Sequence, residues 1–126
     1  MKRILFVCLG NICRSPGVEA IMNHLIEKAG MKKQFVCDSA GIIGYHAGEM
    51  ADSRMRAHAS RRGYKVTSIS RQVIPSDFDR FDMIVGMDGQ NILDLRSMVR
   101  SDEKLAKIVR MTDFCARHQL NEVPDP

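Results

Sequence analysis

Residues 3 to 30 read RILFVCLGNICRSPGVEAIMNHLIEKAG, and this stretch decides the fold. Its first six residues, which end at Cys8, form an apolar run typical of a buried strand in a parallel sheet. After a short polar loop, Ser15 and Pro16 predict the start of a helix, with Ser15 as the N-cap. Apolar residues recur at helical spacing from Val18 to Ala29, and Gly30 is a natural stop. The stretch therefore predicts a strand, a tight loop and a helix, which is the opening half of a βαβ unit.

The rest of the chain continues the same alternation. Further strands are expected at residues 34–40, 82–87 and 105–111, and further helices at 54–62 and 89–99. Strands that alternate with helices are typical of a parallel sheet covered on both faces. The sequence therefore predicts an α/β fold with a four-stranded parallel sheet and helices on both faces.

Size and composition limit the class of protein. A chain of 126 residues corresponds to about one domain. The hydrophobic fraction of 44% excludes a disordered chain, and the longest apolar run, Ile4 to Leu9, is far too short to span a bilayer. No signal-peptide pattern follows the basic residues at the start, so we expect a cytoplasmic protein without membrane insertion.

Charge and cysteine content narrow the possible partners and cofactors. The formal net charge of +4 favours anionic ligands only weakly and is not a signature of nucleic-acid binding. Four cysteines without a CxxC pair indicate thiols or catalytic groups in a cytosolic chain, not a disulfide framework. The four histidines are scattered along the chain. We therefore expect no zinc site.

The loop after the first strand has the composition of an anion-binding site with a nucleophile. Backbone N–H groups in a tight loop before a helix form a nest for anions, and the helix N-terminus adds positive potential. Both features stabilise a thiolate at Cys8. Arg14 provides a planar fork for two phosphate oxygens, and the Ser15 hydroxyl can reach the thiolate. Gly10 and Asn11 tolerate the left-handed backbone that such a loop can require.

A nucleophile beneath a cradle for an anion suggests phosphoryl transfer to sulfur. The leaving alkoxide or phenolate then needs a proton from a general acid. Asp125 is the candidate, because Pro124 and Pro126 on either side would hold its loop stiffly. Two simpler interpretations stay open: Cys8 as a buried thiol at a strand end, and Asp125 as an exposed carboxylate near the chain end.

At this point several motifs coincide with one known family. They are VCLGNICRSP at residues 7–16, DSAG at 38–41, GYH at 44–46, RQ at 71–72, the stretch 79–88, and DP at 125–126. Together they cover most of the chain, and it resembles the low-molecular-weight protein-tyrosine phosphatases. The resemblance implies the fold of that family and hydrolysis of phosphotyrosine through a phosphocysteine, without a metal or a cofactor.

The resemblance also implies a role for each matching residue. Cys8 corresponds to the nucleophile and Arg14 to the arginine of the phosphate-binding loop (P-loop). Ser15 corresponds to the serine that stabilises the thiolate as a leaving group, and Asp125 to the acid that later acts as a base. Asn11 corresponds to the asparagine that braces the loop through hydrogen bonds. The residues expected to bind substrate are Leu9, Gly10, Asn11, Ile12, Cys13 and Tyr45, with Leu9 and Tyr45 as walls of the cleft.

Cys13 corresponds to a second loop cysteine that often forms a reversible disulfide with the nucleophile in this family. The alternative for Cys13, a small residue at the helix start without a redox role, stays open. Family members continue beyond the Asp-Pro pair into a final helix, whereas this sequence stops at Pro126. We therefore expect one phosphatase domain over residues 1–126 that lacks the C-terminal helix, with a weaker anchor for Asp125.

Three other functions compete with this interpretation. A thioredoxin-linked arsenate reductase shares the fold and loop but needs two further downstream cysteines, and residues 81–90 contain none. Relatives that hydrolyse phosphoarginine carry threonine where this chain has Ile12, which favours the phosphotyrosine branch. An anion sensor with this fold would not need the Asp-Pro acid. The expected partners are phosphotyrosine proteins and, as in bacterial relatives, a tyrosine kinase; nucleic acid is not expected.

Overall fold

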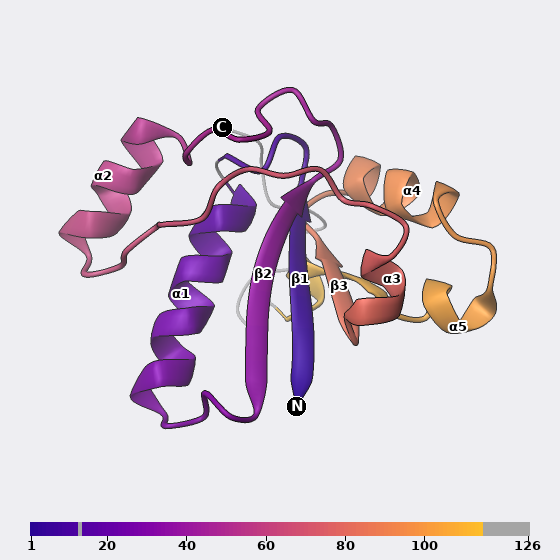
Figure 1. Cartoon of the computed structure of the whole chain (residues 1–126), viewed down its shortest axis with the longest axis horizontal. Coiled ribbons are helices and arrows are strands. Elements are labelled where there is room, and N and C mark those ends of the chain that lie inside the picture. Colours follow the sequence, from indigo (N-terminus) through magenta and orange to yellow (C-terminus); the bar gives the residue numbers. More distant parts are fainter. Residues whose placement is uncertain (13, 115–126) are drawn as a thin grey trace.

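The computed structural model describes residues 1–12 and 14–114 and contains a four-stranded sheet in which all pairs are parallel. The strands are β1 (Lys2–Cys8), β2 (Phe35–Gly41), β3 (Met83–Gly86) and β4 (Ile108–Arg110), in the order β2-β1-β3-β4 (Figure 1). Thus β1 is central, and its carboxyl end lies between the ends of β2 and β3. The predicted fold class is confirmed.

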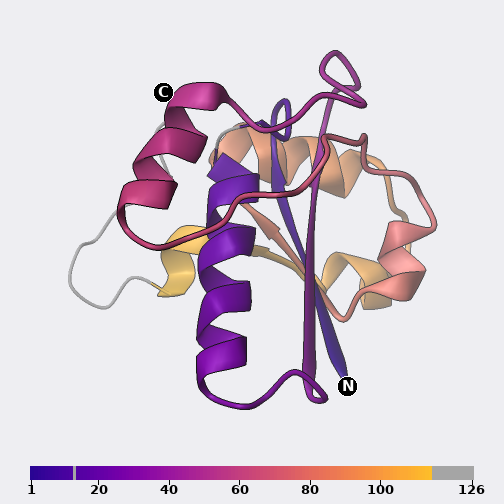
Figure 2. The ribbon, with the colours of Figure 1, turned by 60° about the vertical axis from the view of Figure 1, so that its left-hand side comes forward.

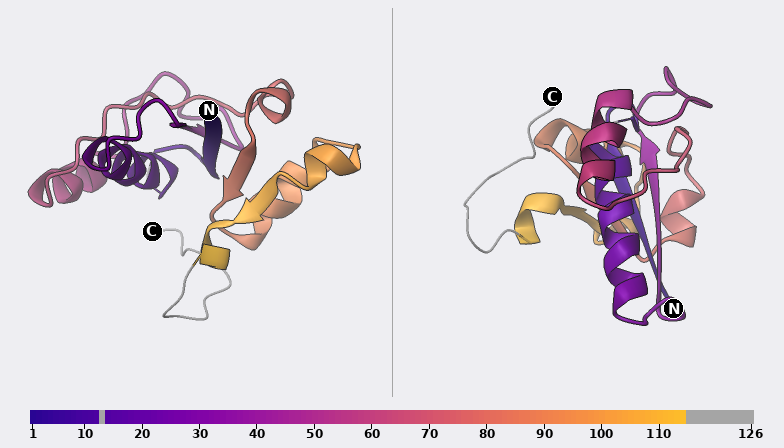
Figure 3. Two further views of the ribbon diagram at one scale, coloured as in Figure 1. Left: turned by 90° about the horizontal axis from the view of Figure 1, so that it is seen from below. Right: turned by 90° about the vertical axis from the view of Figure 1, so that its left-hand side faces the viewer.

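Helices lie on both faces of this sheet. They are α1 (Arg14–Lys28), α2 (Ser53–Arg61), α3 (Asp77–Arg80), α4 (Gly89–Ser97) and α5 (Asp102–Leu105), followed by the 3-10 helix η1 (Met111–Phe114). Figure 3 shows α1 on one side of the sheet and α3, α4 and α5 on the other. Figure 2 shows α2 beyond the first turns of α1, at the outside of the molecule.

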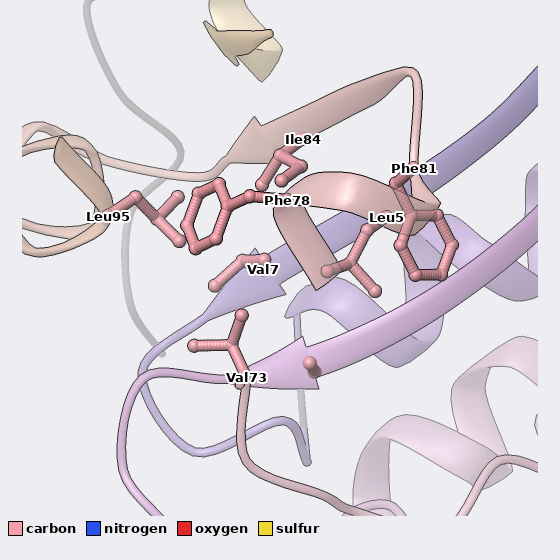
Figure 4. Close-up of a cluster of buried hydrophobic side chains, with 8 residues drawn as sticks. Leu5, Val7, Val73, Phe78, Phe81, Ile84 and Leu95 are labelled. Carbon is pink, nitrogen blue, oxygen red and sulfur yellow. The ribbon is translucent and has the colours of Figure 1, made fainter. Parts of the chain in front are cut away.

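The strand β1 divides the core into two layers because successive side chains point to opposite faces. Leu5 and Val7 belong to the layer beneath α3 and α4, which Figure 4 shows with Phe78 and Leu95. Phe6 and Cys8 belong to the opposite layer, against which Val18 and Met22 of α1 pack. The nucleophile candidate therefore ends a buried strand on the α1 face of the sheet. The complete first layer consists of Leu5, Val7, Ala40, Val73, Phe78, Phe81, Ile84 and Leu95.

The first helix differs from the prediction in two respects. It begins at Arg14, so Ser15 lies inside the first turn and is not the N-cap. The physical reason is that the Ser15 hydroxyl contacts the Cys8 thiol and the Asn11 amide and does not cap the helix. The predicted apolar face is also only partly buried: Ile26 is buried, whereas Ile21 and Leu25 are exposed.

The other predicted ends of helices and strands agree with the structure to differing degrees. The helix predicted at 54–62 is confirmed as α2; the Asp52 carboxylate caps its start, and Gly63 follows its end with a φ of 85°. The last strand was predicted too long, because α5 occupies residues 102–105. Both α3 and α5 were missed, since four residues are too few to show a helical period. None of the described helices is long and apolar enough to cross a membrane.

Candidate active site

The loop between β1 and α1 packs tightly against the end of β2. Backbone N–H groups of Ile42 and Ile43 donate to the carbonyl oxygens of Cys8 and Leu9, both at 3.0 Å. Gly41 permits this approach, because a Cβ atom there would lie only 3.0 Å from the Leu9 carbonyl oxygen and the Gly10 carbonyl carbon. A side chain at position 41 would therefore push the loop away from the sheet.

Two further segments hold the loop from the side of α2. The Ser70 hydroxyl donates to the Gly10 carbonyl oxygen at 2.9 Å. The Asp52 N–H, just before α2, donates to the Ile12 carbonyl oxygen at 2.7 Å. With its carbonyl oxygens engaged by neighbouring segments, the loop can turn N–H groups toward its concave side, as an anion-binding nest requires.

Cys8 is almost completely buried, with 3% of its surface exposed. Its Sγ lies 3.0 Å from the Ser15 Oγ and accepts from the Asn11 N–H at 3.3 Å. The Ser15 Oγ also accepts from the Asn11 side-chain Nδ2 at 3.0 Å. Because that amide already supplies a proton to Oγ, the hydroxyl proton of Ser15 is available for the sulfur. Sγ thus accepts from the Asn11 N–H and lies within hydrogen-bond distance of the Ser15 hydroxyl, and both groups can donate to an anionic sulfur.

Asn11 links the loop to the segment that follows α2. Its φ of 58° places it in the left-handed region, where Asn is one of the few residues tolerated. Its Oδ1 accepts from the backbone N–H of Arg71 at 3.0 Å. Since a backbone N–H can only donate, this contact fixes the orientation of the amide and directs Nδ2 to Ser15. The sequence prediction placed Asn11 as a brace, and the structure supplies the partners.

The backbone of Arg71 is held by its own side chain. The guanidinium donates to both carboxylate oxygens of Asp77, at 3.0 and 3.2 Å, and to Asp38 at 3.1 Å. Asp77 is fully buried and also accepts from the Ile74 N–H at 2.8 Å. Although burial alone would lower the pKa of Arg71, the bonds and charge of Asp77 and Asp38 raise it. Arg71 therefore stays charged and holds the donor that faces Asn11.

Arg14 is also buried and forms an ion pair with Asp88, with 2.8 Å between Nη1 and Oδ2. The other oxygen of Asp88 accepts from the Asn91 N–H at 2.8 Å and caps α4. Partial burial alone would raise the pKa of Asp88, but the bonds from Asn91 and Arg14 outweigh burial and lower it. The stability that this carboxylate contributes is present above the ordinary pKa of Asp and is lost as the pH falls through the lowered value.

Asp88 caps α4, and the sequence analysis did not anticipate its contact with Arg14. A signal was present, because β3 lies beside β1 and Asp88 follows β3 by two residues. Residues after the carboxyl ends of neighbouring parallel strands meet at one edge of the sheet. The contacts of Ser70 and Arg71 had no comparable signal, since they come from an irregular segment.

The neutral variant Asp88→Asn tests this contact. Asn caps helices about as well as Asp, but the variant removes the ion pair to the buried Arg14, so the free energy of unfolding should fall by about 1–3 kcal/mol. Without the ion pair, Arg14 loses its orientation and kcat on an aryl phosphate should fall about tenfold, in the range of a lost charged hydrogen bond. Inorganic phosphate should inhibit more strongly, because one negative charge has left the site. Asp94→Asn, on the same helix, is the control; an unchanged kcat in Asp88→Asn would contradict the orienting role.

Leu9 and Tyr45 lie exposed on the loops around the site, and Tyr45 is 83% exposed. The Tyr45 ring meets the His46 ring edge to face, with 4.9 Å between centroids. His46 in turn packs close to Gly10 and contacts the Glu49 carboxylate at 2.6 Å through Nδ1. His46 thus connects Tyr45 with the phosphate-binding loop.

Cys37 provides a contrast with Cys8. It lies half-buried in β2, and burial together with the nearby Glu19 carboxylate raises the pKa of its thiol to about 11. Such a thiol is almost entirely protonated at neutral pH and cannot serve as a nucleophile. Of the two cysteines in the described residues, Cys8 is the one whose sulfur contacts hydrogen-bond donors.

Two of the predicted site residues, Cys13 and Asp125, lie outside the described residues, as does Cys115. The other predicted residues are placed, and Cys8, Asn11, Arg14 and Ser15 come together around one loop. In the part of the chain that the structure describes, no three His, Cys, Asp or Glu side chains gather as a metal site would require.

Comparisons with known proteins agree with this geometry. The family model of the low molecular weight phosphotyrosine protein phosphatases matches residues 3–126. A protein tyrosine phosphatase from Entamoeba histolytica is 48% identical, with a TM-score of 0.95 over 100% of this chain and 80% of that chain. The crystal structure of YfkJ from Bacillus subtilis is 42% identical with a TM-score of 0.94, over 100% and 79% of the two chains. Low molecular weight phosphotyrosine protein phosphatase 1 of Drosophila melanogaster is 40% identical over 126 residues, 100% of this chain and 80% of that relative.

Proposed function

The chain belongs to the low molecular weight phosphotyrosine protein phosphatase family, a family of hydrolases, and from this premise we propose that Cys8 carries the phosphoryl group during hydrolysis. The observation that supports this most strongly is the convergence of the Ser15 hydroxyl and the Asn11 N–H on the buried Sγ of Cys8. A purely structural thiol does not need two hydrogen-bond donors. A thiolate does, both when it attacks phosphorus and when it departs as the leaving group.

The proposed reaction has two steps. The Cys8 thiolate attacks phosphorus, an S–P bond forms, and the O–P bond to the tyrosine breaks as Asp125 gives its proton to the phenolate oxygen. Water then attacks the phosphocysteine while the Asp125 carboxylate takes up a proton. The S–P bond breaks, inorganic phosphate leaves, and the thiolate is regenerated with the hydrogen bond from Ser15.

Arg14 supplies the positive charge in both steps. Its guanidinium can bind two phosphate oxygens at once, and its contact with Asp88 at 2.8 Å orients the group. Transition-state charge spreads over these oxygens, so a preorganised cation and inward N–H groups stabilise it. The N–H groups would come from Leu9, Gly10, Ile12 and Cys13 of the loop, while that of Asn11 donates to the Cys8 sulfur.

Other parts of the proposal rest on the family resemblance. Tyr45 and Leu9 would flank the aromatic ring of the substrate, and Cys13 would protect Cys8 as a reversible disulfide. The chain would act as one phosphatase domain over residues 1–126, in the cytoplasm. Its substrates would be phosphotyrosine proteins, with a tyrosine kinase as the enzyme that makes them.

Asp125→Asn tests the acid role through its dependence on the leaving group. On a phenyl-type phosphate with a basic leaving group, the variant should lose about 10²–10⁴ in kcat, the usual scale of general acid catalysis. On a strongly activated aryl phosphate the first step should suffer much less, because that phenolate leaves without a proton. Steady-state kinetics on a series of aryl phosphates measures how kcat depends on the basicity of the leaving group. Asp102→Asn, in α5, is the matched control. An equal loss across the series would mean that Asp125 only positions its loop.

A further inference from the structure

Positive charge is concentrated in one segment of this chain. Between Asp52 and Asp77 there is no acidic residue, and elsewhere in the chain acidic residues outnumber basic ones. Five cations of this segment lie on and just after α2, and we refer to them as the basic patch: Arg54, Arg56, Arg61, Arg62 and Lys65. The net positive charge of the protein therefore comes from the segment 53–76.

The basic patch is accessible, and its cations form no ion pairs among the described residues; the carboxylate of Glu27 lines a neighbouring hollow together with Lys65. No residue of α2 is buried, and Figures 1 and 2 show the helix at the outside of the molecule. Within the described residues, none of the five cations forms an ion pair; Arg56 Nε donates to the Ala51 carbonyl oxygen at 2.9 Å. Uncompensated like charges repel one another, so an anionic partner would be stabilised here.

A hollow of about 440 Å³ lies between α2 and the segment that follows it. Its lining contains two cations of the basic patch, four hydroxyl side chains and no carboxylate. The lining residues are Ser53, Arg56, Ala57, Ser60, Tyr64, Lys65, Val66 and Thr67. Ammonium and guanidinium groups only donate hydrogen bonds and hydroxyls can donate, so the hollow suits a carboxylate or phosphate group.

The hollow begins next to the phosphate-binding loop. Ser53 lines it, and the preceding residue, Asp52, donates its N–H to the Ile12 carbonyl oxygen. Met55 of α2 lies close to Gly17 in the first turns of α1. The near edge of the hollow at Ser53 is thus one residue from a direct contact with the loop, so a peptide with its phosphotyrosine in the loop can extend toward the hollow.

Resting on the proposed phosphatase function, we propose that the hollow and the basic patch bind acidic residues that flank the phosphotyrosine of a protein substrate. A single-stranded nucleic acid would favour exposed aromatic rings for stacking, and Tyr64 of this hollow is half-buried. A membrane surface would favour a broad apolar face, and the hollow offers only Ala57 and Val66. An acidic peptide needs neither feature.

The test compares two phosphotyrosine peptides that differ only in their flanks, one with Asp and Glu, the other with Asn and Gln. For the parent enzyme, the ratio of kcat/KM between the peptides should be about tenfold at low salt, since each exposed ion pair contributes up to about fivefold. The ratio should fall as salt is added, because the Debye length shortens. Lys65→Glu, which reverses a charge, should bring the ratio close to one, and Arg56→Gln, which removes one charge, should lower it to about twofold.

Lys33→Glu is the matched control, with the same charge change in the exposed turn between α1 and β2, at the opposite end of the sheet (Figure 1). It should keep the parent ratio. Because the readout is a ratio, a variant that folds less well lowers both rates and leaves the result interpretable.

Several results would overturn the inference. The kcat/KM ratio of the parent enzyme could be near one, or Lys65→Glu could keep the ratio of the parent. Either result would show that the basic patch does not bind acidic residues beside the phosphotyrosine. A ratio near one together with binding of a single-stranded DNA oligonucleotide or of phosphatidylserine vesicles would assign the basic patch to another polyanion. Hydrolysis of a small aryl phosphate by the parent separates the two proposals, because it tests the Cys8 chemistry alone.

Discussion

Cys8→Ser should lose on the order of 10⁵-fold in kcat while inorganic phosphate still binds. The Ser hydroxyl is far more basic than a thiol and cannot reach the anionic form that attacks phosphorus. The cradle itself does not depend on sulfur, since the loop is held by Gly41, Asp52 and Ser70. Steady-state kinetics on an aryl phosphate and calorimetric titration with phosphate measure the two effects.

Cys37→Ser is the matched control for this experiment. It makes the same chemical change at a thiol whose pKa burial raises to about 11. Its kcat should stay within about twofold of the parent, as expected for a residue away from the loop. Appreciable turnover by pure Cys8→Ser would assign the nucleophile elsewhere.

Arg14→Lys should lose about 10³-fold or more in kcat/KM, although the charge is conserved. A lysine ammonium cannot bind two phosphate oxygens in one plane. It also cannot keep the geometry in which Arg14 reaches Asp88 from a buried position, at 2.8 Å. Both phosphate inhibition and turnover should weaken, and turnover should weaken more because charge develops in the transition state.

Arg80→Lys, at an exposed position of α3, provides the control for the same substitution and should leave both constants unchanged. If Arg14→Lys retained near-parent turnover, a point charge would be sufficient. The bidentate role of the guanidinium would then be wrong.

The sequence predicted the site where its parts are neighbours in the chain. Cys8, Asn11, Arg14 and Ser15 lie within eight residues, so a strand, a tight loop and a helix start are enough to bring them together. The tertiary structure adds contacts between residues that are far apart in the sequence, which local sequence patterns do not predict. Arg71 is 60 residues from Asn11, and Asp88 is 74 residues from Arg14, yet both form hydrogen bonds with the loop or its first helical turn.

The misplaced start of α1 has the same origin. From local preference alone, Ser15 before Pro16 is a good N-cap. In the structure its hydroxyl contacts the Cys8 thiol, and the helix starts at Arg14, two residues before the predicted first helical residue, Pro16. Here a tertiary contact of the polar side chain overrides the local helix-cap signal.

The most direct test of the central claim is to trap the covalent intermediate. During turnover of an aryl phosphate, acid quench on the millisecond scale followed by peptide mass spectrometry should find one phosphoryl group on the peptide that contains Cys8. Asp125→Asn should accumulate more of it on an activated substrate, because the water that releases phosphate has lost its base. A phosphoryl group on another residue, or none at any time during turnover, would contradict the phosphocysteine mechanism.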